Sequence, residues 1–123
     1  MPSTFTTAAA DYTGATATHN KLVFTADATN GGFIQRLRFK AIGTNTASVA
    51  RVFINNGSAN TTASNNTFYG EISLPATTAI ATAATIEIDY PMNFALKAGF
   101  TIYVGLGTTV AAGWVCTAVG GQY

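Results

Sequence analysis

The chain of 123 residues is long enough for one domain with a single hydrophobic core. Only 9% of its residues are charged, against about 25% in an average soluble protein, so hydroxyl and amide groups must keep the surface polar. The formal net charge of +1 gives little long-range field to attract a polyanion, which argues against general binding of nucleic acid or anionic membranes.

The N-terminal 20 residues are rich in alanine and threonine and contain little to bury, apart from a short strand predicted near Phe5. They lack the basic region and apolar region of a secretory signal. We therefore expect residues 1–20 to form an N-terminal arm that lies on a neighbouring subunit in an assembly. Residues 21–123 are expected to form one domain, in a protein made in the cytoplasm.

Alternation of apolar and polar residues, the pattern of strands with one buried face, recurs along the rest of the chain. Both faces of residues 50–55 are apolar except at Arg51, which predicts a central strand. Pro91 has no N–H to donate, which predicts an edge strand or a bulge. Besides the one near Phe5, the predicted strands cover residues 21–26, 33–42, 50–55, 68–74, 85–96, 100–107 and 114–119.

Turn and loop signals separate these strands at the spacing typical of an antiparallel sandwich or barrel. Two long segments of low complexity, residues 55–66 and 76–84, are expected to be surface loops. The alanine-rich residues 79–84 would form at most one turn of helix. About eight antiparallel strands joined by loops of unequal length predict an all-β, jelly-roll-like β-sandwich. An immunoglobulin-like sandwich is the nearest alternative, although its Cys…Trp…Cys pattern is absent.

The segment "RLRFKAIG" places a basic residue at every second position of a predicted strand. Strict alternation puts Phe33, Gln35, Leu37, Phe39 and Ala41 on one face, and Ile34, Arg36, Arg38, Lys40 and Ile42 on the other. The cations are expected either to pair across strands with Glu87 and Asp89 or to meet an acidic neighbour in an assembly. We therefore predict an interface formed by Arg36, Arg38, Lys40, Glu87 and Asp89. The basic face has no aromatic platform, so direct nucleic-acid binding is not expected.

Few residues offer catalytic chemistry. His19 is the only histidine and has no second histidine to complete a metal cluster. Cys116 is the only cysteine, so an intramolecular disulfide and a cysteine-rich zinc site are excluded, and the thiol is predicted to be a small buried apolar group. Glu87 and Asp89 have a spacing close to that of glycosidase carboxylates, but no aromatic cleft accompanies them. We expect no enzyme activity, cofactor or metal.

Three long stretches carry a resemblance to a known group of proteins. "FIQRLRFKAIGTNTASVARVFINNG", "FYGEISLPATT" and "IEIDYPMNFALKAGFTIYVGLGTTVAAGWVCTAVGGQY" together resemble small virion structural proteins of tailed bacteriophages. Some of these are capsid decoration or cement proteins with jelly-roll-like sandwiches. The resemblance covers about residues 32–123, and it includes no catalytic motif. It implies a homo-oligomer such as a trimer, seated on the major capsid protein or another protein of the virion, with no membrane partner.

Two alternative functions remain open within a β-sandwich. A tail or fibre component is a variant of the same virion role. A carbohydrate-binding or receptor-binding module would need exposed aromatic side chains, for which Tyr12, Tyr69, Tyr103 and Trp114 are the candidates. Tyr69 and Tyr103 are predicted on the polar sides of their strands.

Overall fold

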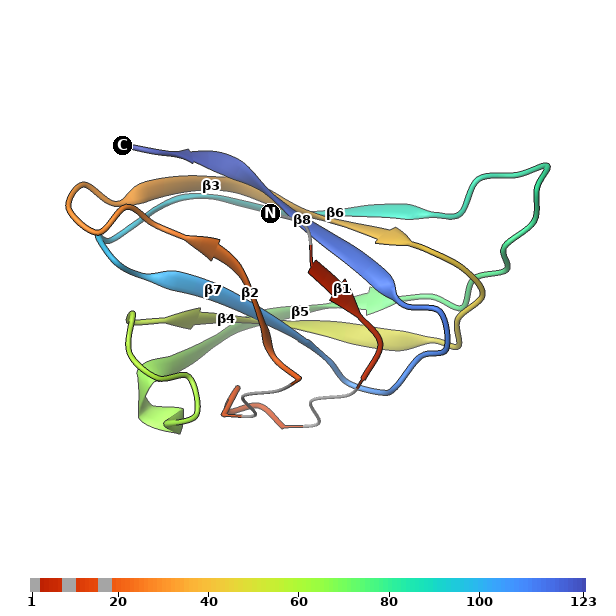
Figure 1. Cartoon of the computed structure of the whole chain (residues 1–123), viewed down its shortest axis with the longest axis horizontal. Coiled ribbons are helices and arrows are strands. Elements are labelled where there is room, and N and C mark those ends of the chain that lie inside the picture. The colour runs from red at the N-terminus through yellow and green to blue at the C-terminus, as the bar shows by residue number, and fades with distance from the viewer. Residues whose placement is uncertain (1–2, 8–10, 16–18) are drawn as a thin grey trace.

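Two antiparallel sheets pack face to face in the computed structural model, which describes residues 3–7, 11–15 and 19–123 (Figure 1). The strands are β1 (Ser3–Phe5), β2 (Lys21–Thr25), β3 (Gly32–Ala41), β4 (Ser48–Asn55), β5 (Asn66–Leu74), β6 (Glu87–Leu96), β7 (Thr101–Leu106) and β8 (Trp114–Gln122). The predicted all-β sandwich of about eight strands is confirmed.

The connectivity of the strands is that of a jelly roll. The first sheet has the order β1-β8-β3-β6 and the second has the order β2-β7-β4-β5. Only the hairpin between β4 and β5 stays within one sheet; every other connection between these strands crosses to the opposite sheet. An immunoglobulin-like sandwich keeps its first two strands in one sheet, so that alternative does not fit.

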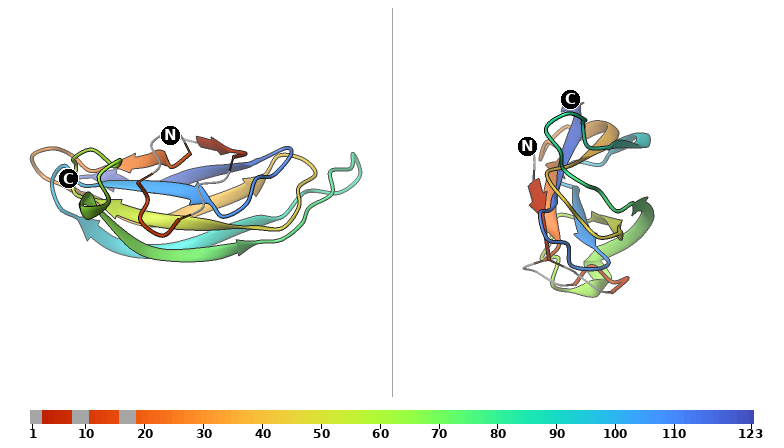
Figure 2. Two further views of the ribbon diagram at one scale, coloured as in Figure 1. Left: turned by 90° about the horizontal axis from the view of Figure 1, so that it is seen from below. Right: turned by 90° about the vertical axis from the view of Figure 1, so that its right-hand side faces the viewer.

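The two sheets form two layers (Figure 2), and side chains from both meet in one core between them. β3 contributes Leu37 and Phe39, β7 contributes Ile102 and Val104, and β8 contributes Trp114. Each of these side chains is almost completely buried. Burying one such aliphatic or phenylalanine side chain contributes about 1.5–3 kcal/mol relative to leaving it in water. The sandwich therefore gains its stability from packing, since a single cysteine cannot form an internal disulfide.

A β-bulge in β3 changes which residues face the core. Strict alternation predicts Phe33 on the same face as Leu37 and Ile34 on the opposite face. The structure instead buries Ile34, and the register of β3 with both β6 and β8 shifts between Ile34 and Arg36. The extra residue relative to β8 is Gln35, which is exposed. The face assignment before the bulge is therefore wrong, because a bulge reverses the parity of the strand.

The position of Pro91 agrees with its missing N–H group. Pro91 lies in β6, which is the edge strand of the first sheet, as predicted. Asn93, two residues later, has a positive φ of 54°, at the place where the register between β6 and β3 shifts. The edge strand is thus irregular, a feature that discourages pairing with a foreign strand.

Aromatic side chains close the seam between the edge strands β5 and β6. The ring of Tyr69 lies 5.2 Å from the ring of Phe94 and 6.2 Å from that of Tyr90, measured between centroids. Gly70 leaves the space that the Tyr90 hydroxyl occupies, because a Cβ atom at this position would collide with that oxygen. The small residue in β5 and the large one in β6 therefore fit each other.

Part of the predicted N-terminal arm belongs to the sandwich. β1 pairs with the first three residues of β8, and Phe5 is buried in the core, which confirms the strand predicted near Phe5. Residues 11–15 lie on the outer face of the second sheet, where Gly14 closely approaches the ring of Phe53. This cover explains why the central strand β4 is apolar on both faces. Residues 1–2, 8–10 and 16–18 of the arm lie outside the described residues.

Three loops at one end of the sandwich contain no charged residue. They are residues 42–47, 75–86 and 107–113, and we call them the uncharged end. Residues 79–84 do not form a helical turn; an isolated bridge joins Ile80 to Ala83 instead. Within the described ranges the only helical element is the 3₁₀ turn Ala63–Asn65, and no helix there is long and apolar enough to cross a membrane.

The buried side chain of Asn45 holds the three loops of the uncharged end together. Its Oδ1 accepts hydrogen bonds from the backbone N–H groups of Ala112 at 3.0 Å and Gly113 at 2.7 Å. Its Nδ2 donates to Thr77 Oγ1 at 3.2 Å and to the Gly113 carbonyl at 3.1 Å. Asn45 and Thr77 also form a two-way backbone bridge. One amide thus links all three loops.

We expect Asn45→Ala to lower the free energy of unfolding by about 3 kcal/mol, because each buried polar group left without a partner costs about 1–3 kcal/mol. Urea unfolding measures this loss. Thr46→Ala, at an exposed position of the same loop, is the matched control and should change stability by no more than about 0.5 kcal/mol. Equal losses in the two variants would contradict the linking role of Asn45.

Candidate functional site

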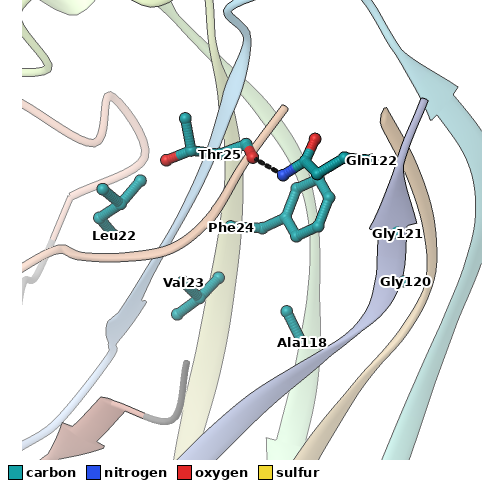
Figure 3. Close-up of a pocket in the computed structure, with 8 residues that line it drawn as sticks. All are labelled: Leu22, Val23, Phe24, Thr25, Ala118, Gly120, Gly121 and Gln122. Atoms are coloured by element: carbon teal, nitrogen blue, oxygen red, sulfur yellow. Dashed lines mark hydrogen bonds between the residues drawn. The ribbon is translucent and has the colours of Figure 1, made fainter. Parts of the chain in front are cut away.

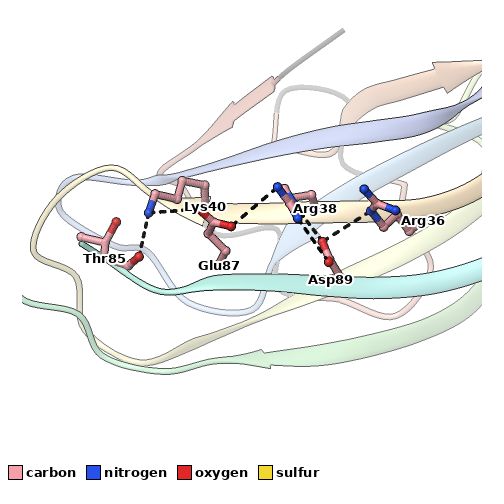
Figure 4. A network of polar contacts seen from close by, with 6 residues as sticks. All are labelled: Arg36, Arg38, Lys40, Thr85, Glu87 and Asp89. Atoms are coloured by element: carbon pink, nitrogen blue, oxygen red, sulfur yellow. Dashed lines mark hydrogen bonds and ion pairs between the residues drawn. The ribbon is translucent and has the colours of Figure 1, made fainter. Parts of the chain in front are cut away.

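Five charged side chains line the outer face where β3 pairs with β6, and we call them the charged ladder. The register places Arg38 opposite Asp89 and Lys40 opposite Glu87. Arg38 Nε donates a hydrogen bond of 3.0 Å to Asp89 Oδ1, and Arg38 Nη1 lies 3.6 Å from Glu87 Oε2 (Figure 4). Lys40 Nζ lies 3.6 Å from Glu87 Oε1, and Arg36 Nε lies 3.7 Å from Asp89 Oδ1. The structure therefore brings all five predicted interface residues together.

Internal pairing balances most of the charge in the ladder. The hydrogen bond from Arg38 is the main reason why the pKa of Asp89 lies below its usual value, and the same bond raises the pKa of Arg38. Lys40 Nζ also donates to the Thr85 carbonyl at 2.7 Å. The expected cross-strand pairing is confirmed. The ladder's contact with an acidic neighbour in an assembly stays a prediction.

A second polar cluster lies on the outer face of the second sheet. The Arg51 guanidinium carbon is 4.2 Å from the centre of the Tyr12 ring, and Arg51 Nη2 is within 3.3 Å of the Tyr12 hydroxyl. Arg51 Nε also donates to Glu71 at 3.3 Å. The Tyr12 ring meets Phe68 edge-on at 5.2 Å, yet Tyr12 remains 56% exposed. Tyr12 is therefore an accessible aromatic ring whose orientation is fixed by a cation–π contact and an aromatic contact.

The other aromatic candidates for sugar binding fit less well. Trp114 is 0% exposed, so its proposed role as an exposed platform is wrong. Tyr69 packs against β6 at the seam between the sheets, because the β4–β5 register shifts between Val52 and Phe53 and places Tyr69 in a bulge. Tyr103 lies half-buried on β7, opposite Phe53 of β4. Tyr12 is the strongest of the four candidates.

His19 and Cys116 are not arranged as a catalytic pair. Cys116 is completely buried in the core, where burial raises the pKa of its thiol to about 12. His19 lines a separate cavity of about 230 Å³, together with Phe5, Thr6, Thr7 and Lys21. Cys116 does not line this cavity. A neutral, buried thiol is a poor nucleophile. Within the ranges that the structure describes, no group of three or more His, Cys, Asp and Glu residues could hold a metal ion.

The uncharged end exposes isoleucine side chains that the sequence pattern did not single out. Ile80 is 56% exposed, and Ile42 and Ile86 are exposed to a similar extent. Ile86 falls within the predicted strand 85–96, but β6 begins one residue later, at Glu87, so Ile86 lies in the loop. The sequence feature that could have identified this exposed surface is a branched apolar residue inside a long loop without charges. Exposed apolar side chains that gather at one end of a domain are candidates for an interaction surface.

An open cleft of about 410 Å³ lies between β2 and β8, and we call it the β2/β8 cleft (Figure 3). It is lined by residues 22–25 of β2 and by Ala118, Gly120, Gly121 and Gln122 of β8. None of these residues is charged. Gln122 bridges the two walls, because its Nε2 donates to the Thr25 carbonyl and its Oε1 accepts from the Asp27 N–H.

No protein-family model matches the chain, and no curated protein or solved structure matches it significantly.

The contribution of Asp89 to stability should depend on pH in a defined direction. A carboxyl group whose pKa is lower in the folded state stabilises the fold above its unfolded pKa of about 3.9, and this contribution is lost as the pH falls through the folded pKa. We expect Asp89→Asn to destabilise the protein at pH 6 and to match the wild type near pH 2, as measured by urea unfolding across pH. Arg38→Gln should show the same pattern, and a loss that persists at pH 2 would contradict it.

Cys116 should be unreactive in the folded protein, because its raised pKa keeps the thiol neutral and its burial denies access. A chromogenic disulfide reagent at pH 8 is expected to modify Cys116 only after urea has unfolded the chain. Rapid modification of the native protein would contradict this expectation, because it would show that the thiol is accessible and activated.

Proposed function

We propose that this protein is a non-enzymatic structural protein of a bacteriophage virion, and specifically a capsid decoration or cement protein that binds the shell as a homo-oligomer. The observation that carries the proposal is the uncharged end, where exposed isoleucines stand on loops held by Asn45. A preorganised apolar surface on a soluble domain serves binding to another protein, because little conformational freedom is lost on contact.

The remaining surface supports the same role. A shell component makes many repeated contacts, and a surface of low charge favours such association. The charged ladder pairs within one chain and therefore offers short-range complementarity to a partner, without a strong field that would attract polyanions. The sequence resemblance to small virion proteins supplies the identity of the proposed particle. A position on the tail or in a fibre is a variant of this proposal.

The Tyr12 cluster favours a second candidate function, binding of carbohydrate on a receptor. Sugars stack on exposed aromatic rings that have polar groups beside them. Tyr12 provides such a ring, and Arg51 and Glu71 provide the neighbouring polar groups. The cluster is small and lies on an open face, so we rank this function below shell binding.

Co-sedimentation tests the shell-binding proposal. Emptied shells of the parent phage that lack this protein are mixed with the purified chain and pelleted. We expect a fixed number of copies per shell and a higher temperature of shell disruption. Absence of co-sedimentation with shells contradicts the decoration role, and binding to tails instead selects the tail variant. Binding to a glycan array that is lost in Tyr12→Ala, but retained in Thr13→Ala, selects carbohydrate recognition.

A further inference from the structure

The segment of residues 75–86 projects beyond the other loops of the uncharged end, and we call it the finger (Figures 1 and 2). Hydrogen bonds hold both sides of the finger to the rest of the domain. Ala79 N–H donates to Thr44 Oγ1 at 3.1 Å, and Thr85 Oγ1 donates to the Ala41 carbonyl at 2.8 Å. Ile80 lies at the tip, next to its bridge with Ala83. The finger is thus an anchored, uncharged projection with one large apolar side chain at its end.

The β2/β8 cleft offers an uncharged, partly apolar concave surface away from the end of the molecule that carries the finger. Val23 is buried, Phe24 is half-buried and Leu22 is exposed along the β2 wall, while small residues form the β8 wall. Two hydrogen bonds fix the β2 wall in place: Ser3 Oγ donates to the Leu22 carbonyl, and Gln122 Nε2 donates to the Thr25 carbonyl. The cleft itself is open to solvent.

Both walls of the cleft carry strand edges that lack a pairing strand in the described part of the chain. β2 pairs only with β7. β8 pairs with β1 only at Trp114, Val115 and Cys116, so its later residues have only β3 beside them. Unpaired edges present backbone N–H and C=O groups that readily accept an additional segment of chain. The cleft therefore combines apolar contact surface with two strand edges, although the Leu22 and Thr25 carbonyls of β2 already accept side-chain hydrogen bonds.

We propose that the finger of one copy of this chain occupies the β2/β8 cleft of a second copy. The finger extends from one end of the long axis, whereas β2 and the C-terminal part of β8, which line the cleft, lie away from that end, so a chain cannot place its finger in its own cleft (Figure 1). The two surfaces match in chemistry, since neither contains a charged residue. Such a head-to-tail contact is heterologous: it produces a ring when the rotation between copies closes, and a filament when it does not.

The proposed contact goes beyond the proposed function, because it requires no shell or other particle. Its chemistry also separates it from the charged ladder. Contact between uncharged surfaces is insensitive to screening, so self-association should be as strong in 1 M salt as in 0.1 M salt. An interface built from the ladder would weaken over the same range.

Two variants disable the two halves of the contact separately. Ile80→Asp places a charge on the tip of the finger. Gly121→Glu places a charge in the cleft, and the fold should tolerate it, because a Cβ atom at Gly121 meets nothing within 4 Å. Ile42→Asp is the matched control, since it changes an equally accessible isoleucine of the uncharged end that is not on the finger. Circular dichroism confirms that each variant is folded.

Sedimentation velocity over a concentration series measures the result. We expect the wild type and Ile42→Asp to associate equally, and each of the other two variants to associate at least tenfold more weakly, which is about 1.4 kcal/mol. An equal mixture of Ile80→Asp and Gly121→Glu retains one intact finger and one intact cleft. This mixture should therefore form a 1:1 dimer and nothing larger.

Three results would overturn the proposal: a wild type that is monomeric at every concentration, an Ile80→Asp variant that associates like the wild type, or a mixture that stays monomeric. A monomeric wild type that pellets with phosphatidylcholine vesicles would assign the finger to a lipid surface instead.

Where a variant fails to fold, hydrogen exchange of the wild type replaces the measurement on that variant. Amides of residues 22–25 and 118–122 should gain protection as protein concentration rises, and unchanged protection contradicts the contact.

Discussion

The face that β3 turns toward the core determines most of the other features of this molecule, because β3 pairs with β8 on one side and β6 on the other. With Leu37 and Phe39 inside, Arg38 and Lys40 must point outward. The register with β6 then places those cations opposite Asp89 and Glu87. The hydrophobic requirement of one strand thus positions the charged ladder on the opposite face, and the bulge after Ile34 places Ile34 in the core together with Leu37 and Phe39.

Alternation was sufficient to predict the strands, the two-sheet architecture and the cross-strand charge pairs. It predicted a central β4 because Phe53 is as apolar as the residues on the core side, and the missing N–H of Pro91 predicted that β6 is an edge strand or carries a bulge. It could not predict the bulges beside Gln35 and Tyr69, since each depends on how neighbouring strands pair rather than on local residue type. The burial of Phe53 under residues 11–15 and the exposure of Ile80 depend on where loops lie in space, which a period of two residues does not encode.

Charge is distributed unevenly over the surface, and the distribution divides the molecule into regions of different chemistry. The ladder occupies a strand face, and Arg51 with Glu71 occupies the face of the other sheet. The loops of the uncharged end and the walls of the β2/β8 cleft contain no charged residue. Contacts along the faces therefore depend on ionic strength, whereas contacts at the uncharged end and the cleft depend on apolar area and shape.

The choice of an amide at Asn45 has a consequence for the environments that the protein can tolerate. Asn45 donates and accepts at once, and its side chain does not ionise. A carboxylate in the same position would lose acceptors on protonation, and a histidine would change charge near neutral pH. The side chain of Asn45 therefore keeps the same donors and acceptors in acid and in alkali, and the geometry that it gives to the uncharged end does not depend on its protonation.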